Sequence, residues 1–328
     1  MSTLADLAGL ESGEHEAARR YGRYIGWRLA QGLLVVAGAV VVSFLITNLS
    51  GNPGQVIGGS FLSPQQRQQI IDQLGYNRPV LQRLGSYLAG AAHGDFGTSY
   101  QTGEPALRVV LTALPNTVLL IGCAIALAVV VAVPVAMLSV LRRGSAGDRS
   151  SRVVMMLAGA LPDFWIAIIL VRLLSVNLSW LPAIGFTSPQ SLIMPTLALA
   201  LPLIPAFVRL LRGALLDVVG QDFVTVLRSK GFRDRFIVAH QALRNAMVPF
   251  VTLLAMQIGW LLGGTIIVEV IFAWPGIGSV INNAVQARDV AVIQAAVVVV
   301  ACGYVLLNLA ADVVVTVIDP RVRSGARP

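Results

Sequence analysis

Lys230, the only lysine in the chain, is the first residue to test for nucleotide chemistry. A P-loop needs its lysine after a glycine and before a serine or threonine, so that backbone amides and the ammonium group hold phosphates together. Lys230 instead follows Ser229 and precedes Gly231. The sequence therefore excludes a P-loop ATPase, and any ATP hydrolysis that drives this protein must come from a partner.

The histidines and cysteines show no catalytic or metal-binding pattern. His15, His93 and His240 are far apart in the sequence, and neither H-E-x-x-H nor G-x-S-x-G occurs. Cys123 and Cys302 lie within apolar runs and lack the spacing of metal ligands. We therefore expect neither enzymatic activity nor a metal site.

Three further candidates, Asp163, Gln257 and Trp260, lie deep within long apolar stretches. Ionisable groups in such surroundings are costly and usually face a cavity or a partner. Asp163 follows Pro162, so its carboxylate either faces a translocation path, where it would attract a cationic group, or satisfies backbone groups that the proline frees. Gln257 and Trp260 either line the same path or hold neighbouring helices together. The sequence leaves both alternatives open.

The composition indicates what kind of protein positions these residues. Of 328 residues, 56% are hydrophobic and only 12% are charged, and the mean hydropathy is +0.76. A soluble domain carries about 25% charged residues, because its surface faces water. The chain is therefore predicted to be an all-α integral membrane protein.

Six stretches reach the roughly 20 apolar residues that a membrane-spanning helix needs. An even number of spans places both termini on the same side of the membrane. In the fourth stretch, Pro195, Pro202 and Pro205 each remove a backbone donor, so this helix is expected to be bent or broken. In the fifth, Gly259 and Gly263 have a spacing that lets two helices approach closely. The predicted spans are 25–49, 117–141, 153–176, 192–211, 246–272 and 290–318.

Basic residues predict the orientation, because short cytoplasmic loops carry an excess of lysine and arginine. With both termini inside, 18 of the 24 basic residues lie on the cytoplasmic side and five lie outside. The prediction is a cytoplasmic tail at 1–24, a transmembrane domain at 25–318 and a cytoplasmic tail at 319–328. The domain contains an outer loop, 50–112, and a cytoplasmic loop, 213–245. Since the net charge of +8 is spread over short segments beside the spans, we expect membrane lipid and no nucleic acid as a partner.

The cytoplasmic loop contains a short amphipathic pattern. Phe223, Val226 and Leu227 fall at i, i+3 and i+4, and Gly231 is a typical helix terminator. The pattern predicts a helix near 221–231. Such a helix either lies on the membrane surface or docks in a groove of a partner, and its amphipathic pattern does not separate the two.

Two stretches of this loop resemble a known family. Residues 222–232 read D-F-V-T-V-L-R-S-K-G-F, and residues 240–249 read H-Q-A-L-R-N-A-M-V-P. They are similar to the permeases of binding-protein-dependent ABC importers, in particular the first permease of oligopeptide, dipeptide and nickel systems. The chain departs from the family pattern at Val226, Leu227 and Ser229, where small residues are usual. The resemblance implies an ATPase-coupling role for Asp222, Phe223, Thr225, Arg228, Ser229, Lys230, Gly231, Arg244 and Asn245.

Four further stretches resemble signatures of the same family and occur in the same order. They are 74–79, 94–99, 268–278 and 319–321, which read L-G-Y-N-R-P, G-D-F-G-T-S, V-E-V-I-F-A-W-P-G-I-G and D-P-R. The outer stretches supply candidates for bracing an outer gate or contacting a docked binding protein. These candidates are Asp95, Glu269, Trp274, Pro275 and Gly276.

The resemblance implies the type I permease fold of ABC importers, in a multi-pass protein of the bacterial cytoplasmic (inner) membrane. One chain would form half of a pore, and a second related permease would form the other half. Two ATPase subunits would bind ATP and magnesium, so no cofactor is expected on this chain, and an extracytoplasmic binding protein would deliver the cargo. Short peptides are the expected cargo, with nickel or another small solute as alternatives. An ion-coupled carrier is the alternative mechanism, but it would favour several carboxylates at the membrane centre and internal repeats.

Overall fold

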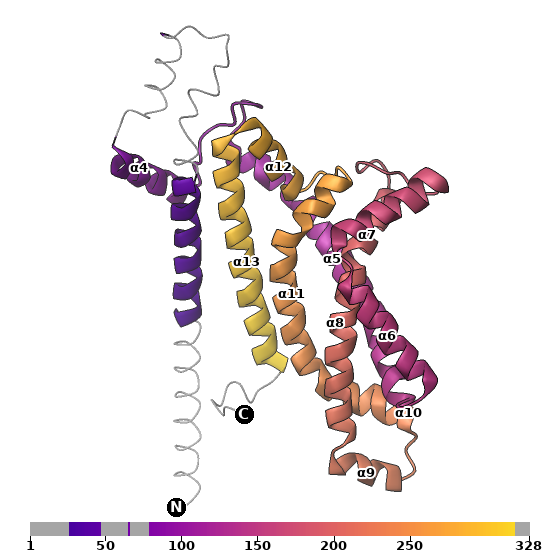
Figure 1. Cartoon of the computed structure of the whole chain (residues 1–328). Coiled ribbons are helices and arrows are strands. Elements are labelled where there is room, and N and C mark those ends of the chain that lie inside the picture. The colour runs from indigo at the N-terminus through magenta and orange to yellow at the C-terminus, as the bar shows by residue number, and fades with distance from the viewer. Residues whose placement is uncertain (1–25, 47–64, 66–78, 319–328) are drawn as a thin grey trace, which may run out of the picture.

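The computed structural model describes residues 26–46, 65 and 79–318, and its regular elements are helices (Figure 1). An isolated β-bridge joins Thr98 to Pro105. The all-α prediction is therefore confirmed. The two predicted terminal tails and much of the predicted outer loop lie outside the described residues.

Five helices are long and apolar enough to cross a membrane, and a pair of helices joined at a sharp bend forms a sixth candidate span. These elements fall on the six predicted stretches and make the chain a multi-pass membrane protein. The side that the termini face stays a prediction. The spans are Gly26–Ile46, α5 (Ala106–Leu141), the pair α6 (Ala146–Ala160) and α7 (Asp163–Leu170), α8 (Ile193–Val219), α11 (Leu243–Ile271) and α13 (Val290–Ile318).

The third predicted span, 153–176, consists of two helices that meet at Pro162, the proline expected to free backbone groups there. The chain turns by 95° between α6 and α7, which continues as a π-helical turn, Val171–Asn177. Leu161, at the break, has an extended backbone with φ −83° and ψ 128°. The reason is local: the ring of Pro162 clashes with a helical conformation of the residue before it, which moves to the β region.

The fourth span, expected to be bent or broken, is not broken. Helix α8 continues through Pro202 and Pro205, and Pro195 lies in its first turn, where a missing N–H costs nothing. Interior prolines do not break two other long helices either, since α5 contains Pro115 and Pro134 and α11 contains Pro249. Helix α8 is the most buried of the long helices: in its most apolar stretch 67% of the residues are buried, against 22% to 29% in the other four.

A stripe of alanines on α5 allows α8 to pack closely against it. Ala124, Ala128, Ala132 and Ala136 are all fully buried at a spacing of four residues, which places them on one helix face. Small residues at this spacing let two backbones approach, the main source of helix association in lipid. The core formed by α5, α8 and α11 includes an edge-to-face contact between aromatic rings of α8 and α11, with centroids 5.4 Å apart.

One predicted close approach is present and the other is not. A side chain at Gly259 would meet the ring of Tyr304 on α13, so α11 and α13 pack tightly there. A side chain at Gly263 would meet nothing within 4 Å. The small-residue spacing therefore predicted a contact, but only one of its two positions makes it.

The two ends of the helices carry different short elements (Figure 1). At one end, α12 (Ile277–Ala287) packs against α5, α11 and α13. Helix α4 (Val80–Ala92) lies at the same end and belongs to the predicted outer loop. Helix α5 begins well before the predicted end of the outer loop at 112. At the other end lie α9 (Asp222–Ser229) and α10 (Asp234–Phe236), followed by a π-helical turn, so the predicted cytoplasmic loop is largely helical.

Candidate functional site

Helix α9 ends where the sequence predicts. Gly231 has φ +84°, in the left-handed region that favours glycine. Its N–H bonds the carbonyl of Arg228 at 2.9 Å, and the N–H of Phe232 bonds the carbonyl of Leu227 at 3.2 Å. These two bonds form a Schellman motif, which satisfies carbonyls at the helix end.

One residue anchors α9, and its predicted apolar face is largely exposed. Val224 is fully buried and is the residue that attaches the helix to the rest of the chain. Phe223 and Val226 are exposed, and Leu227 is half-buried. The apolar pattern therefore identified a face of α9 that is directed away from the rest of the protein. The buried residue, Val224, was missed because it does not belong to the i, i+3, i+4 pattern.

Most of the remaining predicted coupling residues lie on or directly after α9, whereas Arg244 and Asn245 lie in the first turn of α11. The Arg228 Nε donates to the Asp234 carboxylate at 2.9 Å, an exposed pair that ties α9 to α10. The Ser229 hydroxyl donates to the carbonyl of Val226 at 2.8 Å. The exposed predicted residues are Asp222, Thr225, Arg228, Ser229, Lys230, Gly231, Arg244 and Asn245.

Sequence reasoning missed a stack of aromatic rings beside α9. The rings of Phe232 and Phe236 stack with centroids 5.3 Å apart, and those of Phe236 and His240 stack at 4.6 Å. All three side chains are exposed. The spacing of four residues was the available signal, because residues at i and i+4 share a helix face.

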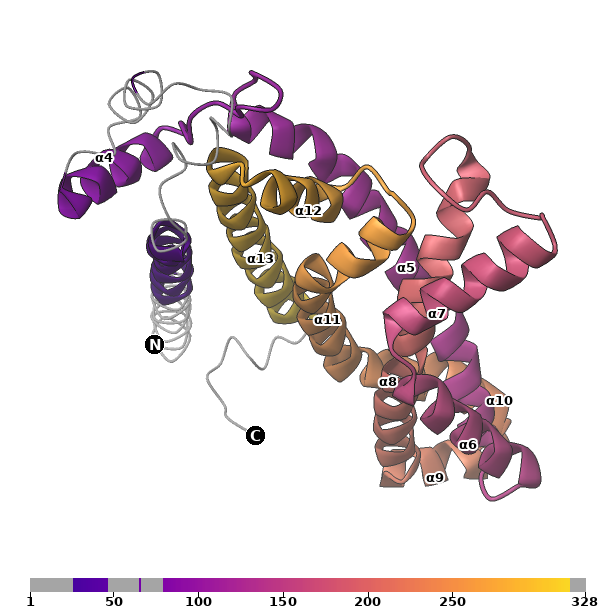
Figure 2. The same cartoon turned by 45° about the horizontal axis from the view of Figure 1, so that its top comes forward.

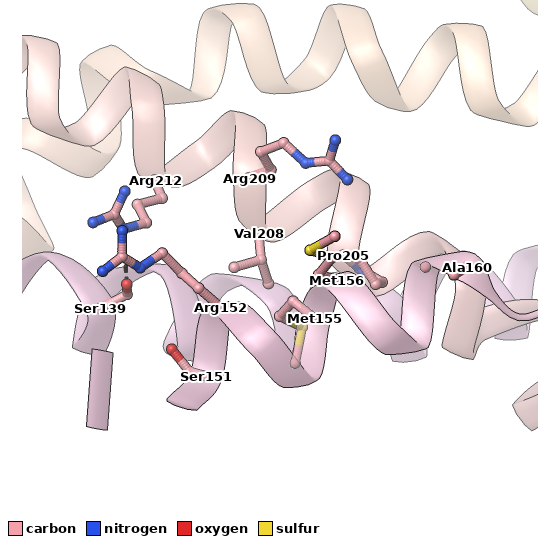
Figure 3. A pocket seen from close by; sticks show the side chains of 11 residues that line it. Ser139, Ser151, Arg152, Met155, Met156, Ala160, Pro205, Val208, Arg209 and Arg212 are labelled. Atoms are coloured by element: carbon pink, nitrogen blue, oxygen red, sulfur yellow. Dashed lines mark hydrogen bonds between the residues drawn. The ribbon is translucent and has the colours of Figure 1, made fainter. Parts of the chain in front are cut away.

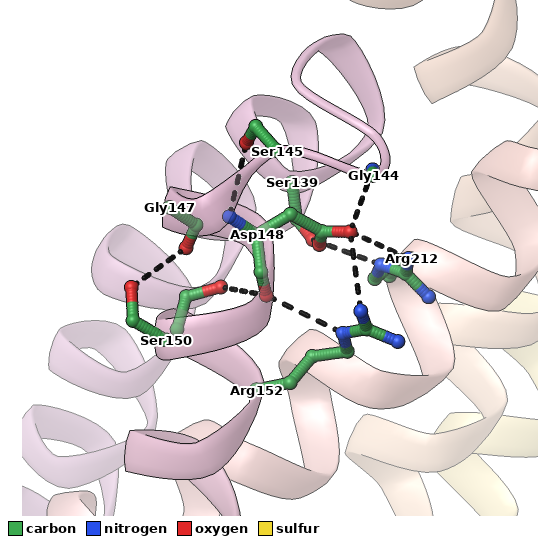
Figure 4. Close-up of polar contacts among 9 residues, drawn as sticks. Ser139, Gly144, Ser145, Gly147, Asp148, Ser150, Arg152 and Arg212 are labelled. Carbon is green, nitrogen blue, oxygen red and sulfur yellow. Dashed lines mark hydrogen bonds and ion pairs between the residues drawn. The ribbon is translucent and has the colours of Figure 1, made fainter.

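A buried carboxylate was also missed. Figure 4 shows Asp148, whose side chain is 1% exposed, held by groups from three helices. The hydroxyl of Ser139 donates to Oδ1 at 2.5 Å, and the N–H of Gly144 donates to Oδ2 at 3.2 Å. Arg212 reaches Oδ2 at 3.4 Å, and Arg152 does so at 3.7 Å.

The Asp148 cluster joins the ends of α5, α6 and α8. Ser139 is shared, because its oxygen also accepts a hydrogen bond from the Nε of Arg212 at 2.8 Å. A local signal was present, since the Ser145 hydroxyl accepts a bond from the backbone N–H of Asp148, a helix start of the type S-x-x-[DE]. Because α8 leads directly into α9, the cluster connects the segment that carries the exposed helix α9 to two further spans.

A second buried carboxylate braces the opposite end. Glu269 is fully buried, so it lies on no surface that a docked protein contacts. The Thr117 hydroxyl on α5 donates to it at 2.7 Å, and the N–H of Gly278 donates at 2.6 Å. The Thr117 oxygen in turn accepts from the N–H of Ile277 at 2.8 Å. The carboxylate and hydroxyl therefore fix the turn between α11 and α12 against α5.

Trp274 is the fully buried centre of this turn. Its Nε1–H donates to the carbonyl of Asn116 at 3.0 Å, and the Asn116 amide donates to the carbonyl of Pro275 at 2.8 Å. Its ring packs on Phe186, with centroids 4.6 Å apart. Gly276 lies against the Glu269 carboxylate, which leaves no room for a side chain.

The other predicted outer and path residues lie in separate places. Asp95 is exposed, and its carboxylate accepts the N–H of Gly97 at 2.9 Å, within its own loop. Asp163 is half-buried at the start of α7 and accepts the N–H of Phe164 at 2.7 Å, so it satisfies a backbone donor at the proline break. On α11, Gln257 is half-buried and Trp260 is exposed.

The long apolar helices define a class of protein, the multi-pass membrane proteins. Residues 124–324 match the family described as "Binding-protein-dependent transport system inner membrane component", and the chain belongs to this family. It is therefore a transport component of an ABC importer in the inner membrane and associates with other importer components.

Curated relatives and solved structures agree with this family. The oligopeptide transport system permease protein AppB of Bacillus subtilis is 33% identical over 311 residues, which cover 91% of this chain and 98% of AppB. The glutathione transport system permease protein GsiC of Escherichia coli K12 is 32% identical, covering 87% of this chain and 93% of GsiC. A chain of the MetNI methionine ABC transporter, described as inward facing, has the same fold, with a TM-score of 0.57, 16% identity and coverage of 64% of this chain and 96% of that chain.

Proposed function

We propose that this chain forms half of the translocation pore of an ATP-driven importer of short peptides. The names of the two relatives support this cargo class, because glutathione is itself a tripeptide and AppB is named for oligopeptides. Nickel or another small solute remains the second candidate cargo. This chain contributes its half of the pore, and partner subunits bind magnesium and hydrolyse ATP.

The exposed apolar face of α9 is the observation that carries this proposal. A short helix with exposed Phe223 and Val226, flanked by Arg228 and Lys230, fits a groove in another protein, which is a common mode of helix recognition. We infer that each of two ATPase subunits receives one such helix, one from this chain and one from a second related permease. An extracytoplasmic binding protein completes the importer.

The mechanism follows from how α9 is attached. Helix α8 ends at Val219 and α9 begins at Asp222, so little chain is available to absorb a displacement between them. Closure of the ATPase pair on ATP would move α9, and α8 would transmit that motion to its neighbours α5, α6, α7 and α11. The Asp148 cluster couples the same motion to the turn between α5 and α6. The pore would thereby alternate between two access states.

The translocation path remains part of the proposal. Asp163, Gln257 and Trp260 are the residues assigned to it, with Asp163 attracting a cationic group of the peptide. Asp163→Asn would then lower uptake of peptides that carry a free amino terminus more than uptake of amino-blocked peptides. Equal uptake of both by the variant and the parent would remove Asp163 from the path.

Co-purification of the ATPase tests the proposal. The tagged chain would be purified from membranes of cells that express the whole importer, and the amount of bound ATPase would be measured. Phe223→Asp places a charge on the exposed face of α9 and should reduce the bound ATPase at least tenfold. Val285→Asp, an equally polar change at an exposed position of α12, should leave it unchanged.

Two results would overturn the proposal. If the unaltered chain brought down no ATPase, the ion-coupled carrier would become the mechanism to pursue. If ATPase were bound but labelled di- and tripeptides were not taken up by the reconstituted importer, while a nickel chelate was, the cargo assignment would fall and the coupling assignment would stand.

A further inference from the structure

A cavity of about 510 Å³ lies between α6 and α8 (Figure 3). Arg152 and Arg212 lie at one end of the cavity, with Arg209 on the same helix as Arg212, and Ala160 lies toward the other end. The rest of its wall is mostly apolar and includes Met155 and Val208. The cavity therefore has a cationic end and an apolar end.

The charge of the cavity lining is not balanced. Arg152 and Arg212 share a single carboxylate, that of Asp148. Arg209, whose side chain points away from these two in Figure 3, is exposed and makes no ion pair within the part of the chain that the structure describes. The three guanidinium groups of the lining therefore have one carboxylate partner, which favours binding of an anion.

The length of the cavity suits a molecule with a charged head and an apolar body. Arg212 and Pro205 are two turns apart on α8, which corresponds to about 10 Å along the helix. On α6, Arg152 and Ala160 are separated by a similar length. A side chain added at Gly159 would press on Pro205, so the two helices approach closely at the apolar end of the cavity.

The position of the cavity favours lipid over a solute in the pore. Figure 2 shows α6 at the periphery of the molecule, far from α13. Met156, which lines the cavity, is 77% exposed, and its neighbour Leu157 is 64% exposed. The cavity wall is thus continuous with an exposed apolar helix face, which a membrane protein turns toward acyl chains. The arginines lie at the end of the helices that carries α9, the predicted cytoplasmic side.

We propose that this cavity binds one anionic phospholipid of the cytoplasmic leaflet. The phosphate lies between Arg209 and the two arginines of the Asp148 cluster, and the glycerol and first acyl carbons lie along Met155 and the α8 wall. Basic pockets between spans on the cytoplasmic side are suited to such headgroups. A bound lipid would stabilise the packing of α6 on α8, the helix that leads directly into α9.

Native mass spectrometry of the purified importer tests the site. The complex would be depleted of lipid and given equal amounts of phosphatidylglycerol and phosphatidylcholine. The expected result is one phosphatidylglycerol retained per chain in preference to phosphatidylcholine. Arg209→Gln should reduce this retention about fivefold, the contribution of one basic residue near an anionic headgroup. Arg149→Gln, an equal charge change on α6 outside the cavity, should not.

A second measurement locates the lipid. A photoreactive phosphatidylglycerol should crosslink to peptides of α6 and α8, and Arg209→Gln should reduce that crosslink about fivefold while thermal stability is unchanged. Equal lipid retention in the Arg209 and Arg149 variants, or equal retention of both lipids, would overturn the proposal. So would displacement of the lipid by millimolar inorganic phosphate, which would indicate a site for a free anion. Capture of another protein chain by a crosslinker at Met156 would overturn it as well, because that face would then be a subunit interface.

Discussion

The Asp148 cluster offers the sharpest test of how the cytoplasmic end is held together. Asp148→Asn keeps the size of the side chain but removes its charge. Two hydrogen bonds, from the Ser139 hydroxyl and the Gly144 N–H, change from charge-assisted to neutral, at a cost of about 1 kcal/mol each. Arg212, whose side chain is only 20% exposed, loses its countercharge, which costs about another 1 kcal/mol.

Arg152 adds little to this sum. Its side chain is 53% exposed, and exposed pairs contribute between zero and about 1 kcal/mol. The expected loss is therefore about 3 kcal/mol, which corresponds to a fall of about 5 to 10 °C in the apparent Tm. The measurement is thermal unfolding of the detergent-solubilised protein, followed by intrinsic tryptophan fluorescence.

Asp217→Asn is the matched control. Asp217 is an exposed carboxylate near the end of α8 that makes no ion pair among the described residues, so its replacement should leave the Tm within about 1 °C. A double-mutant cycle with Arg212→Gln should show a coupling energy of about 1 to 2 kcal/mol. If Asp148→Asn and Asp217→Asn had the same Tm, or if the coupling energy were zero, the cluster would not hold α6 to α8.

Four further substitutions follow from the geometry. Gly231→Ala places a side chain at φ +84°, which should destabilise the end of α9 by about 1 kcal/mol. The variant should therefore yield less co-purified ATPase. An unchanged yield would contradict a role for this helix end. Gly259→Ala should lower the Tm, because the added side chain clashes with Tyr304 at a cost of about 1 to 3 kcal/mol. Gly263→Ala should leave the Tm unchanged or raise it. A lower Tm for the Gly263 variant than for the Gly259 variant would show that α11 and α13 pack differently. Glu269→Ala leaves the Thr117 hydroxyl and two backbone donors buried without an acceptor and should cost about 2 to 4 kcal/mol in thermal unfolding, which an unchanged Tm would refute.

Sequence analysis predicted well what depends on local pattern. The span at 290–318 coincides with α13, and the predicted end of the coupling helix at Gly231 coincides with its Schellman motif. Both signals are local: the length of an apolar helix matches the thickness of the membrane, and a glycine permits a left-handed turn. The predicted roles of the coupling, path and outer residues stay proposals.

Prolines show why the same local reasoning succeeds in one helix and fails in another. At Pro162 the preceding residue, Leu161, takes the extended conformation that a proline favours in its neighbour, and the helix ends. Pro202 and Pro205 lie inside the continuous helix α8, as Pro115 and Pro134 lie inside α5. The prolines themselves could be identified in the sequence, but only the structure shows which of them ends a helix.

Composition and apolar periodicity, read along one dimension, determined that this chain is a helical membrane protein. The coupling role of its cytoplasmic loop came from the resemblance of residues 222–232 and 240–249 to the permeases of ABC importers, and it stays a proposal. Only the tertiary structure decided which polar groups meet. Asp148 bonds Arg212 across 64 positions of sequence, and Thr117 bonds Glu269 across 152. No local pattern encodes such pairs, because they form only after apolar packing has brought distant helices together. A carboxylate in an apolar stretch of sequence therefore indicates that a hydrogen-bonding or charged partner is needed, and only the fold decides which residue is that partner.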